Sequence, residues 1–511
     1  MRFAAALSSI RTSWAVVVFL ACIGIAVAQS PVPTLTPTQA QTQAQTQAQT
    51  QAQTQTQTQT QAQTQAQTKA QTQLREIYRE LVEINTTDSV GSCTLAAEAM
   101  QKRLVAGGIP AADIRIIVPP GGPKKGNLVA RLRGTGAKKP ILLLGHLDVV
   151  EAKREDWTRD PFKLIEEDGY FYARGASDDK SMVAVFLDNL IRYKREGYRP
   201  ERDIIVAATC DEEIIPSPFN GAEYLLKNQR DLIDAEFALN EGSSGLLDNN
   251  GKPVRMGIQA GEKVFQTYTL EATNRGGHSS VPVKDNAITH MAGGLARLGA
   301  HDWPFRLSDT TRTYFERMAA IEGGQTGADM RAILRDPPDA VAMARLAQTP
   351  AHNATFRTTC VATMIEGGHA TNALPQRVRA TVNCRVLPGE PVDEVTATII
   401  RVLDNDKIKV TPVGTPTLSP APPLTRAIME PVERVTAQMW PGVPVVPTML
   451  VAATDSRFMN NAGIPAYGLS GMFRDPDGGG VHGLNERIRV QSLYEGHEFL
   501  YRVVKLYAGG R

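Results

Sequence analysis

The sequence predicts an α/β fold in which a mostly parallel sheet is interrupted by an inserted α+β domain of the split βαβ type. Three observations predict it. Short apolar runs at 141–144, 204–209 and 237–240 are typical of buried parallel strands, which are covered on both faces. Segments with helical spacing alternate with these runs. From residue 264 the expected strands instead alternate apolar and polar residues, as half-exposed strands do.

The folded part is expected to begin near Leu74, with the helices and strands of the parallel sheet. Helical spacing is clearest where Met182, Val185 and Phe186 recur on one face. The expected helices cover 74–84, 96–106 and 178–193, and the expected strands cover 127–132, 141–144, 204–209 and 237–240. Because 511 residues exceed what one core usually holds, two folded units are expected.

The inserted domain is expected over 259–418, between a first part over 74–258 and a second part over 419–511. Its predicted strands cover 264–273, 355–366, 377–386 and 407–411, and its predicted helices cover 286–298 and 392–403. The connector over 302–353 is too long for a bare loop in a compact domain, so we expect it to carry helices of its own. A helix over 493–507 should end the second part.

The N-terminal segment has the pattern of a secretory signal. An apolar run over 14–25 follows two arginines, and small residues precede the expected cleavage point after Ala28. We therefore expect export to the periplasm or the cell exterior. A retained membrane anchor is the alternative, although the run is short for the ~20 residues of a spanning helix. Residues 29–73, rich in Gln, Thr and Ala, have almost nothing apolar to bury and are expected to form a disordered linker.

Composition excludes some functions and leaves one question open. The formal net charge of +2 argues against a nucleic-acid partner. Beyond the signal segment, no apolar stretch is long enough to cross a membrane. None of the five cysteines has CxxC spacing, which argues against a Cys-rich zinc site. Cys360 and Cys384 lie on two segments expected to pair, so a disulfide is conceivable, but two free core cysteines are the favoured interpretation.

Ionisable side chains stand directly after the predicted parallel strands, at the edge where ligands of open α/β sheets bind. A His and an Asp follow the strand at 141–144, and three consecutive acidic residues follow the strand at 204–209. Three adjacent carboxylates repel one another unless a cation compensates. The residues at strand ends are His146, Asp148, Asp211, Glu212, Glu213 and Glu241. Asp178 and Asp179 lie at a turn into the helix expected from 178, and His482, in the glycine-rich segment GGGVHGLNE, completes the set.

This set predicts a hydrolytic metal site. Two histidines with three or four carboxylates suit zinc, and a carboxylate readily bridges a second ion. Two metal ions ~3.5–4 Å apart form a clamp for amide or phosphate hydrolysis. One spare carboxylate would remain as a general base. Singly, each residue has a structural interpretation, since an Asp can cap a helix and acidic pairs are common on surfaces. Their combination at strand ends favours the metal site.

In these residues and the motifs around them, the chain resembles the di-zinc exopeptidase and amidohydrolase family that includes aminoacylase, glutamate carboxypeptidase, carnosinase and carboxypeptidase S. The similarity covers about 74–507, where GHLDVV, ARGASDDK, DEE, NEGS, GGHSSVP, GGHATNALP and HGLNE occur in the family's order. The long insertion, together with ATDSRF and HGLNERI, is most similar to the carboxypeptidase S and N-acyl-amino-acid hydrolase branch.

The resemblance implies a role for each ligand candidate and a cofactor of two zinc ions per chain, for which Co²⁺ or Mn²⁺ can substitute. It implies that His146 and Glu241 bind one zinc and that Glu213 and His482 bind the other. Asp178 would bridge both ions. The inserted domain would then be a lid and dimerisation domain, so a homodimer is expected.

The resemblance also implies catalytic and substrate-binding residues. Glu212, the first Glu of DEE, would be the general base, and Asp148 would orient the ring of His146. His278 would polarise the scissile carbonyl, in this family often across a dimer interface. The expected substrate-binding residues are Asn372, Arg385, which would hold a carboxylate, and Thr454.

These features predict a secreted di-zinc metallohydrolase. Its expected reaction cleaves the amide bond of an N-acyl amino acid or small peptide next to a free carboxylate, with a water at the metals that Glu212 activates. A di-zinc aminopeptidase or dipeptidase is the first alternative, and the motifs of Asn372 and Arg385 argue against it. A non-catalytic binding protein on this fold is the second, and it would be expected to have lost a ligand or Glu212.

Overall fold

The structure, a computed structural model, describes residues 69–510. The predicted signal segment and the linker up to residue 68 lie outside the described residues. Residues 69–83 are helical, so the prediction of a disordered linker is wrong for 69–73. The side-chain amide of Gln73 donates to Asp188 and accepts from Arg195, and these partners on a neighbouring helix hold the polar end of the linker in helical form.

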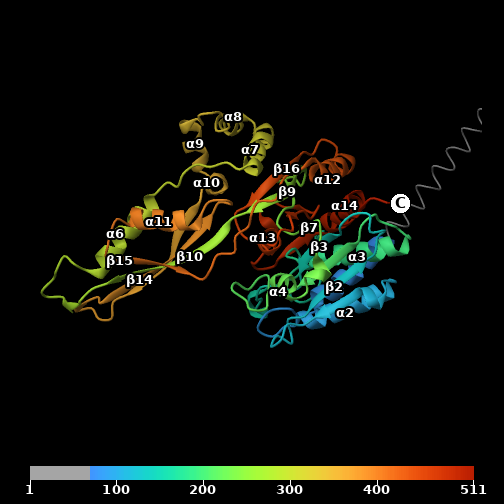
Figure 1. The fold of residues 1–511 in the computed structure, drawn as a ribbon, viewed down its shortest axis with the longest axis horizontal. Helices are drawn as coiled ribbons and strands as arrows, with labels where there is room; N and C mark the ends of the chain where they lie inside the picture. The colour runs from blue at the N-terminus through green and yellow to red at the C-terminus, as the bar shows by residue number, and fades with distance from the viewer. Residues whose placement is uncertain (1–68, 511) are drawn as a thin grey trace, which may run out of the picture. The chain divides into compact units, whose positions relative to one another are not determined.

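A ten-stranded sheet forms the centre of the fold, with a parallel core of four strands (Figure 1). These four are, in order, β6 (Ile204–Thr209), β3 (Ile141–His146), β7 (Phe237–Asn240) and β17 (Ala466–Gly468). On one side follow β2 (Asn127–Leu132) and β1 (Ile114–Ile117), and on the other β9 (Pro253–Glu262), β8 (Gly245–Leu247) and β18 (Phe473–Arg474). β16 (Val445–Leu450) pairs with β9. The mostly parallel α/β fold is therefore confirmed.

Both faces of this sheet are covered by helices, which explains why its parallel strands β6, β3, β7 and β17 are mainly apolar. Ile141 and Leu143 of β3 belong to one core, and Leu142 and Leu144 belong to the other. The first core also contains residues of α2 (Cys93–Ala106), α3 (Lys180–Arg195), α12 (Arg426–Met439) and α14 (Val490–Ala508). The second contains residues of α4 (Gly221–Asn228), α5 (Arg230–Ile233) and α13 (Ser456–Asn461).

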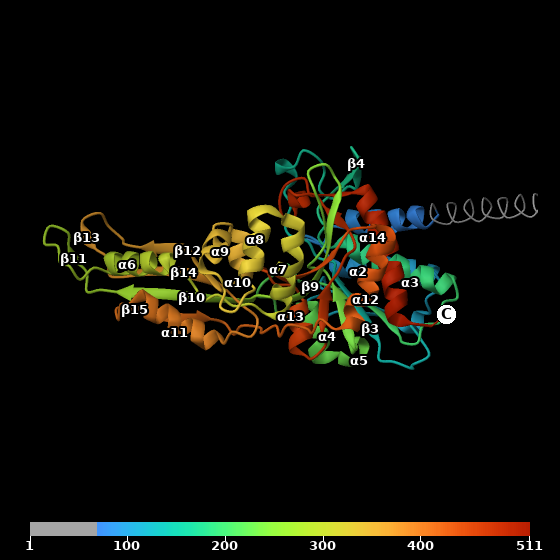
Figure 2. The ribbon, with the colours of Figure 1, turned by 90° about the horizontal axis from the view of Figure 1, so that it is seen from above.

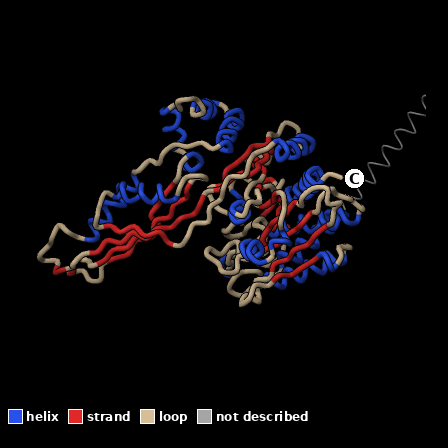
Figure 3. The backbone as a smooth tube through the Cα atoms, in the orientation of Figure 1, coloured by secondary structure: helices blue, strands red, loops and turns tan. Residues whose placement is uncertain are grey.

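A second, antiparallel sheet of four strands forms the inserted domain, and Figure 3 shows its strands and the helices beside it. Its order is β12 (Thr359–Gly367), β14 (Arg377–Val386), β10 (Val264–Thr273) and β15 (Ile408–Val413). Helices α6 (Ala287–Ala300) and α11 (Val392–Leu403) share one apolar core with it. Burial alternates along β10 and β14, as expected for a sheet covered on one face. This is the predicted split βαβ pattern.

Short elements complete the described chain. β11 (Gly277–His278) and β13 (Ala373–Leu374) form a two-stranded ribbon. β4 (Ile165–Glu167), β5 (Tyr170–Tyr172) and β19 (Arg487–Arg489) form a three-stranded sheet. Single 3₁₀ turns lie at Ala111–Asp113, Arg154–Asp156 and Gly478–Gly480.

The long connector carries helices of its own, as predicted. They are α7 (Asp309–Glu322), α8 (Gly324–Ala332), α9 (Ala340–Ala347) and α10 (Pro350–Phe356), and Figures 1 and 2 both show α7, α8 and α9 gathered together. They share a small core around Phe315, Met330 and Phe356. The predicted strand at 355–366 was wrong at its start, because Pro350 begins a helix that runs to Phe356.

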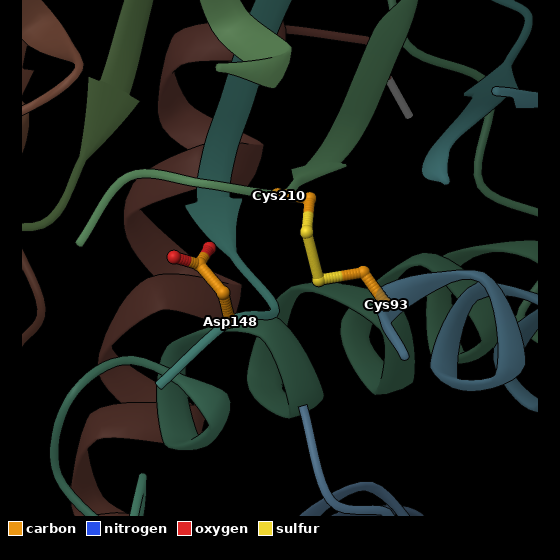
Figure 4. Close-up of side chains that lie close together, drawn as sticks. All are labelled: Cys93, Asp148 and Cys210. Atoms are coloured by element: carbon orange, nitrogen blue, oxygen red, sulfur yellow. A yellow bond between two sulfur atoms is a disulfide. The ribbon is translucent and has the colours of Figure 1, made fainter. Parts of the chain in front are cut away.

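Two disulfides join the four cysteines of the described chain. Cys360 and Cys384 face each other on β12 and β14 with Cα atoms 4.1 Å apart, so the favoured interpretation of free cysteines is wrong. Cys93, at the start of α2, is bonded to Cys210 directly after β6, and Figure 4 shows this bond beside Asp148. The second bond was not predicted, because 117 residues separate its cysteines.

Within residues 69–510, no helix combines the length and apolar character needed to cross a membrane.

Candidate metal centre

The predicted ligands gather at the carboxyl edge of the parallel strands. His146 is the last residue of β3, which lies between β6 and β7. Glu213 follows β6 and Glu241 directly follows β7, so all three side chains start from the same edge. β3 approaches the start of α3 closely at Gly145, where an added Cβ would lie 2.8 Å from a carboxylate oxygen of Asp179. A larger residue there would displace the side chains of Asp179 and Val183.

The first ligand group contains His146, Asp178 and Glu241. Nε2 of His146 lies 3.2 Å from Oδ1 of Asp178 and 3.8 Å from Oε1 of Glu241. The other ring nitrogen, Nδ1, lies 2.9 Å from the main-chain oxygen of Asp148. Because a carbonyl can only accept, Nδ1 carries the proton and Nε2 presents its lone pair to the group.

The second ligand group contains Asp178, Glu213 and His482. Nε2 of His482 lies 2.9 Å from Oε1 of Glu213 and 3.1 Å from Oδ2 of Asp178. Asp178 thus belongs to both groups and turns one oxygen toward each histidine. The structure brings all five predicted ligands together in the predicted grouping, and their metal-binding roles remain predictions.

Charge at this edge is strongly negative. Burial raises the pKa of Glu241 well above its usual range, and the neighbouring Asp178 and Glu212 raise it further. Burial, with Asp178 nearby, also raises the pKa of Asp179 to about 8. Buried carboxylates this close repel one another unless cations compensate. The mixed nitrogen and oxygen donors are those that zinc prefers, so the residues present fit a two-ion site.

Asp148 contacts both His146 and the acidic turn at Glu212 and Glu213, and it is its backbone that orients the ring of His146. Its main-chain carbonyl makes the hydrogen bond to His146, and its carboxylate lies 3.7 Å from Nδ1 of that ring. The carboxylate accepts the backbone N–H groups of Glu212 at 3.2 Å and Glu213 at 3.0 Å. Burial raises its pKa to about 6. Asp148 therefore orients the histidine with its backbone and the acidic turn with its side chain.

Glu486 is a functional residue that sequence reasoning missed. Its buried carboxylate accepts the backbone N–H groups of Gly175, Ser177 and Asp178 at 2.7–3.0 Å. It also pairs with Arg174 at 2.7 Å. These bonds hold the turn that presents Asp178. The HGLNE motif contained the signal, but only its histidine was assigned a role.

The predicted residues of the inserted domain are separate from the ligand groups. His278 is the last residue of β11 and Asn372 directly precedes β13, and both are exposed. The N–H of Ser279 donates to the carbonyl of Asn372 at 2.9 Å. No contact of either residue with the ligand groups occurs within residues 69–510. Arg385 is half-buried on β14, with its guanidinium 4.7 Å from the ring centre of Phe265.

Thr454 is buried, and its hydroxyl already has protein partners. It donates to Glu262 at 2.9 Å and accepts from the backbone of Ser456 at 3.1 Å. Asn240 approaches it at 3.4 Å. These bonds position the loop before α13, and a substrate contact of Thr454 remains a prediction.

Comparison with known proteins is consistent with this geometry. A family model described as peptidase family M20/M25/M40 matches residues 142–506. "Probable carboxypeptidase S-like 2" of Dictyostelium discoideum is 30% identical over 383 residues, covering 72% of this chain and 71% of that protein. "N-fatty-acyl-amino acid synthase/hydrolase PM20D1" of Xenopus tropicalis is 29% identical over 361 residues, covering 69% and 70%.

Solved structures share the fold. The M20 family metallo-carboxypeptidase Sso-CP2 from Sulfolobus solfataricus aligns with a TM-score of 0.62 at 19% identity, covering 85% of this chain and 99% of that chain. The YXEP protein of Bacillus subtilis, described as a dinuclear metal binding peptidase from M20 family, aligns with a TM-score of 0.55 at 12% identity, covering 86% and 100%.

The fold and the two ligand groups define a metallohydrolase of the metallopeptidase and amidohydrolase class. This chain belongs to peptidase family M20. The resemblance found in the sequence is thereby confirmed.

Exchange of Glu486 tests how the turn of Asp178 is held. Glu486→Gln should weaken zinc binding about 10- to 100-fold, because the new amide would turn N–H groups toward the backbone N–H groups that the carboxylate now accepts. Zinc affinity is measured by competition with a coloured chelator. Asp477→Asn is the control, since Asp477 is an exposed carboxylate paired with Arg487. Equal affinities in both variants would contradict the role of Glu486.

Proposed function

We propose that this enzyme is a di-zinc hydrolase that cleaves the amide bond of an N-acyl amino acid or a small peptide next to a free carboxylate. The observation that carries the proposal is the sharing of Asp178 between two ligand groups that each contain a histidine and a second carboxylate. Such a bridged pair of sites is the arrangement that two-metal hydrolases need. The names of the carboxypeptidase S-like and N-fatty-acyl-amino acid hydrolase relatives support the substrate class.

Glu212 is the proposed general base. It is buried at the edge of the ligand groups, and its carboxylate makes no hydrogen bond or ion pair within residues 69–510. Burial raises its pKa well above the usual range, and Asp455 and Glu213 add to the rise. Zinc ions, when bound, would supply charge that polarises the amide carbonyl and acidifies a water molecule. Glu212 takes the proton of that water and passes it to the leaving nitrogen.

Arg385 is the proposed partner of the substrate carboxylate. Its guanidinium has no acid within ion-pair distance in the described chain, only the ring of Phe265. A guanidinium binds a carboxylate through two parallel hydrogen bonds, which a lysine does not reproduce. A substrate whose free carboxylate adjoins the scissile amide would use this group.

The substrate class is tested by comparing an N-acyl amino acid with its C-terminal amide. The zinc-loaded enzyme should cleave the free acid with the higher kcat/KM, because only that substrate carries the charge that Arg385 can bind. Equal rates on both would contradict the proposal. Preference for a free amine with a blocked C-terminus would establish the aminopeptidase alternative.

Glu212→Gln tests the base. The variant should keep two zinc equivalents, as the wild type does, and lose about 10²- to 10⁴-fold in kcat, the usual contribution of a general base. Metal content is measured on the protein used for kinetics. Glu213→Gln is the matched control and should lose zinc, because Glu213 is a predicted ligand. Full turnover by a metal-replete Glu212→Gln enzyme would exclude the role.

We also propose a homodimer through the inserted domain, in which His278 of the partner subunit polarises the scissile carbonyl. The support is that His278 is exposed, while the only hydrogen-bond partner of its imidazole ring in the described chain is Ser280. Glu212→Gln and His278→Ala homodimers should each be inactive. A co-purified heterodimer of the two variants should have about half the activity of the wild-type dimer, because one of its two active sites contains both native residues. No recovery would mean that His278 acts within its own chain.

We also propose that the protein is exported from the cytoplasm. The two disulfides support it, because such bonds persist in oxidising compartments. Protein secreted by the native cell should begin at Gln29 and contain no free thiol by mass spectrometry. An intact N-terminus on soluble, reduced protein would contradict export.

A further inference from the structure

Arg457 is a buried arginine whose guanidinium has no anionic partner. It is the second residue of α13 and is 8% exposed. Its Nη1 makes no hydrogen bond, and none of its nitrogens forms an ion pair with a residue in the range 69–510. The ring of Phe458 lies 4.5 Å from the guanidinium carbon. Burying a charge without a partner is costly, so this arrangement indicates an anion that binds from outside the chain.

Arg385 of the inserted domain faces the same region. It lies on β14 opposite Phe265 on β10 and Thr359 on β12. Burial lowers its pKa, and the nearby positive charge of Arg457 lowers it further. A short chain of contacts links the two arginines, although they belong to different domains of the fold. Thr359, which pairs with Arg385, lies 3.4 Å from Nζ of Lys263, and Glu262, next to Lys263, accepts the N–H of Thr454, three residues before Arg457.

Nearby acids do not supply the missing charge. Three buried acids are close enough to interact electrostatically with Arg457, namely Glu212, Asp455 and Glu262. Asp455 and Glu262 already accept hydrogen bonds from other side chains. None of the three acids lies within ion-pair distance of Arg457 in the described chain, and Glu212 is the proposed base.

A third cation in this region is already engaged. Lys263 lies between β9 and β10, and its Nζ donates to the main-chain oxygen of Arg357 at 2.6 Å. Burial, with Arg385 nearby, lowers its pKa to about 7. The two arginines are therefore the groups that remain available to an anion.

We propose that Arg457 and Arg385 together bind the free carboxylate of the substrate, which makes Arg457 a specificity-determining residue of the catalytic domain. This inference rests on the proposed function. A carboxylate has two oxygens with about four acceptor sites, enough for two guanidinium groups. It also neutralises their mutual repulsion. A substrate that carries this anion would join the catalytic domain to the inserted domain beside Glu212.

The test compares an N-acyl amino acid with its C-terminal amide in four enzymes: wild type, Arg457→Met, Arg457→Lys and Arg385→Met. Each arginine variant should lose about 10- to 100-fold in kcat/KM for the free acid, mainly through KM, as expected for a lost charged hydrogen bond. For the amide, kcat/KM should change less than about threefold in each variant. Arg457→Lys keeps the positive charge near Glu212 but loses the planar guanidinium with its two parallel donors. Its kcat/KM for the free acid should therefore fall as well.

Two controls accompany the comparison. Arg255→Met removes another arginine with unpaired nitrogens, on β9, and should leave both substrates unchanged. Zinc content and thermal unfolding are measured for every variant. If Arg457→Met fails to fold, Arg457→Lys carries the test.

The kinetic results distinguish a role of Arg457 in binding the carboxylate from an indirect one. Equal losses on acid and amide would show that Arg457 acts through Glu212 or through folding, and would overturn the inference. Unchanged kinetics in the Arg457 variants would also overturn it, while the preference of the wild type for the free acid would leave the proposed function standing. A wild type without that preference would refute the proposed function, and the inference with it.

Discussion

The site depends on negative charge held together at one edge of a parallel sheet. Asp178 turns one oxygen toward His146 and the other toward His482, so a single carboxylate joins the two ligand groups. Glu241 and Glu213 add further charge, one in each group. Buried acids at such spacing repel one another unless a cation compensates their charge or one of them takes up a proton. Metal binding is therefore expected to be a condition for the local geometry as well as for catalysis.

The surrounding chain holds this geometry mainly through the backbone. The carboxylate of Asp148 fixes the turn of Glu212 and Glu213, and Glu486 fixes the turn of Asp178. In both cases a buried acid accepts backbone N–H groups, so the side chains of the predicted ligands remain free to bind metal ions. The disulfide between Cys93 and Cys210 restrains the end of β6 directly before the acidic turn.

The proposed substrate site would draw residues from both domains. β9 ends at Glu262 in the central sheet, and β10 begins at Val264 in the inserted domain. Glu262 accepts a hydrogen bond from Ser419, on the returning segment of chain, at 3.0 Å. This bond ties the two crossings between the domains together. Glu262 also accepts the N–H of Thr454, in the loop directly before the helix that carries Arg457.

The sequence by itself determined the local structure and the family. β2, β6, β7, β10 and β14 have the predicted bounds, because their burial follows patterns that neighbouring residues already display. The ligand candidates could also be named, since each follows a strand or lies in a family motif. These signals are local, and a single segment of chain carries each one.

Only the tertiary structure decided which distant groups meet. Glu486 lies 308 residues from Asp178, whose backbone it binds, and the cysteines of one disulfide are 117 residues apart. The unpaired state of Arg457 depends on every segment that packs around it. Although Glu486 and Arg457 lie within the HGLNE and ATDSRF motifs, nothing in the local sequence shows which groups they and the cysteines meet. Hydrophobic periodicity is a property of one segment, whereas charge pairing and hydrogen bonding depend on where the folded chain places each partner.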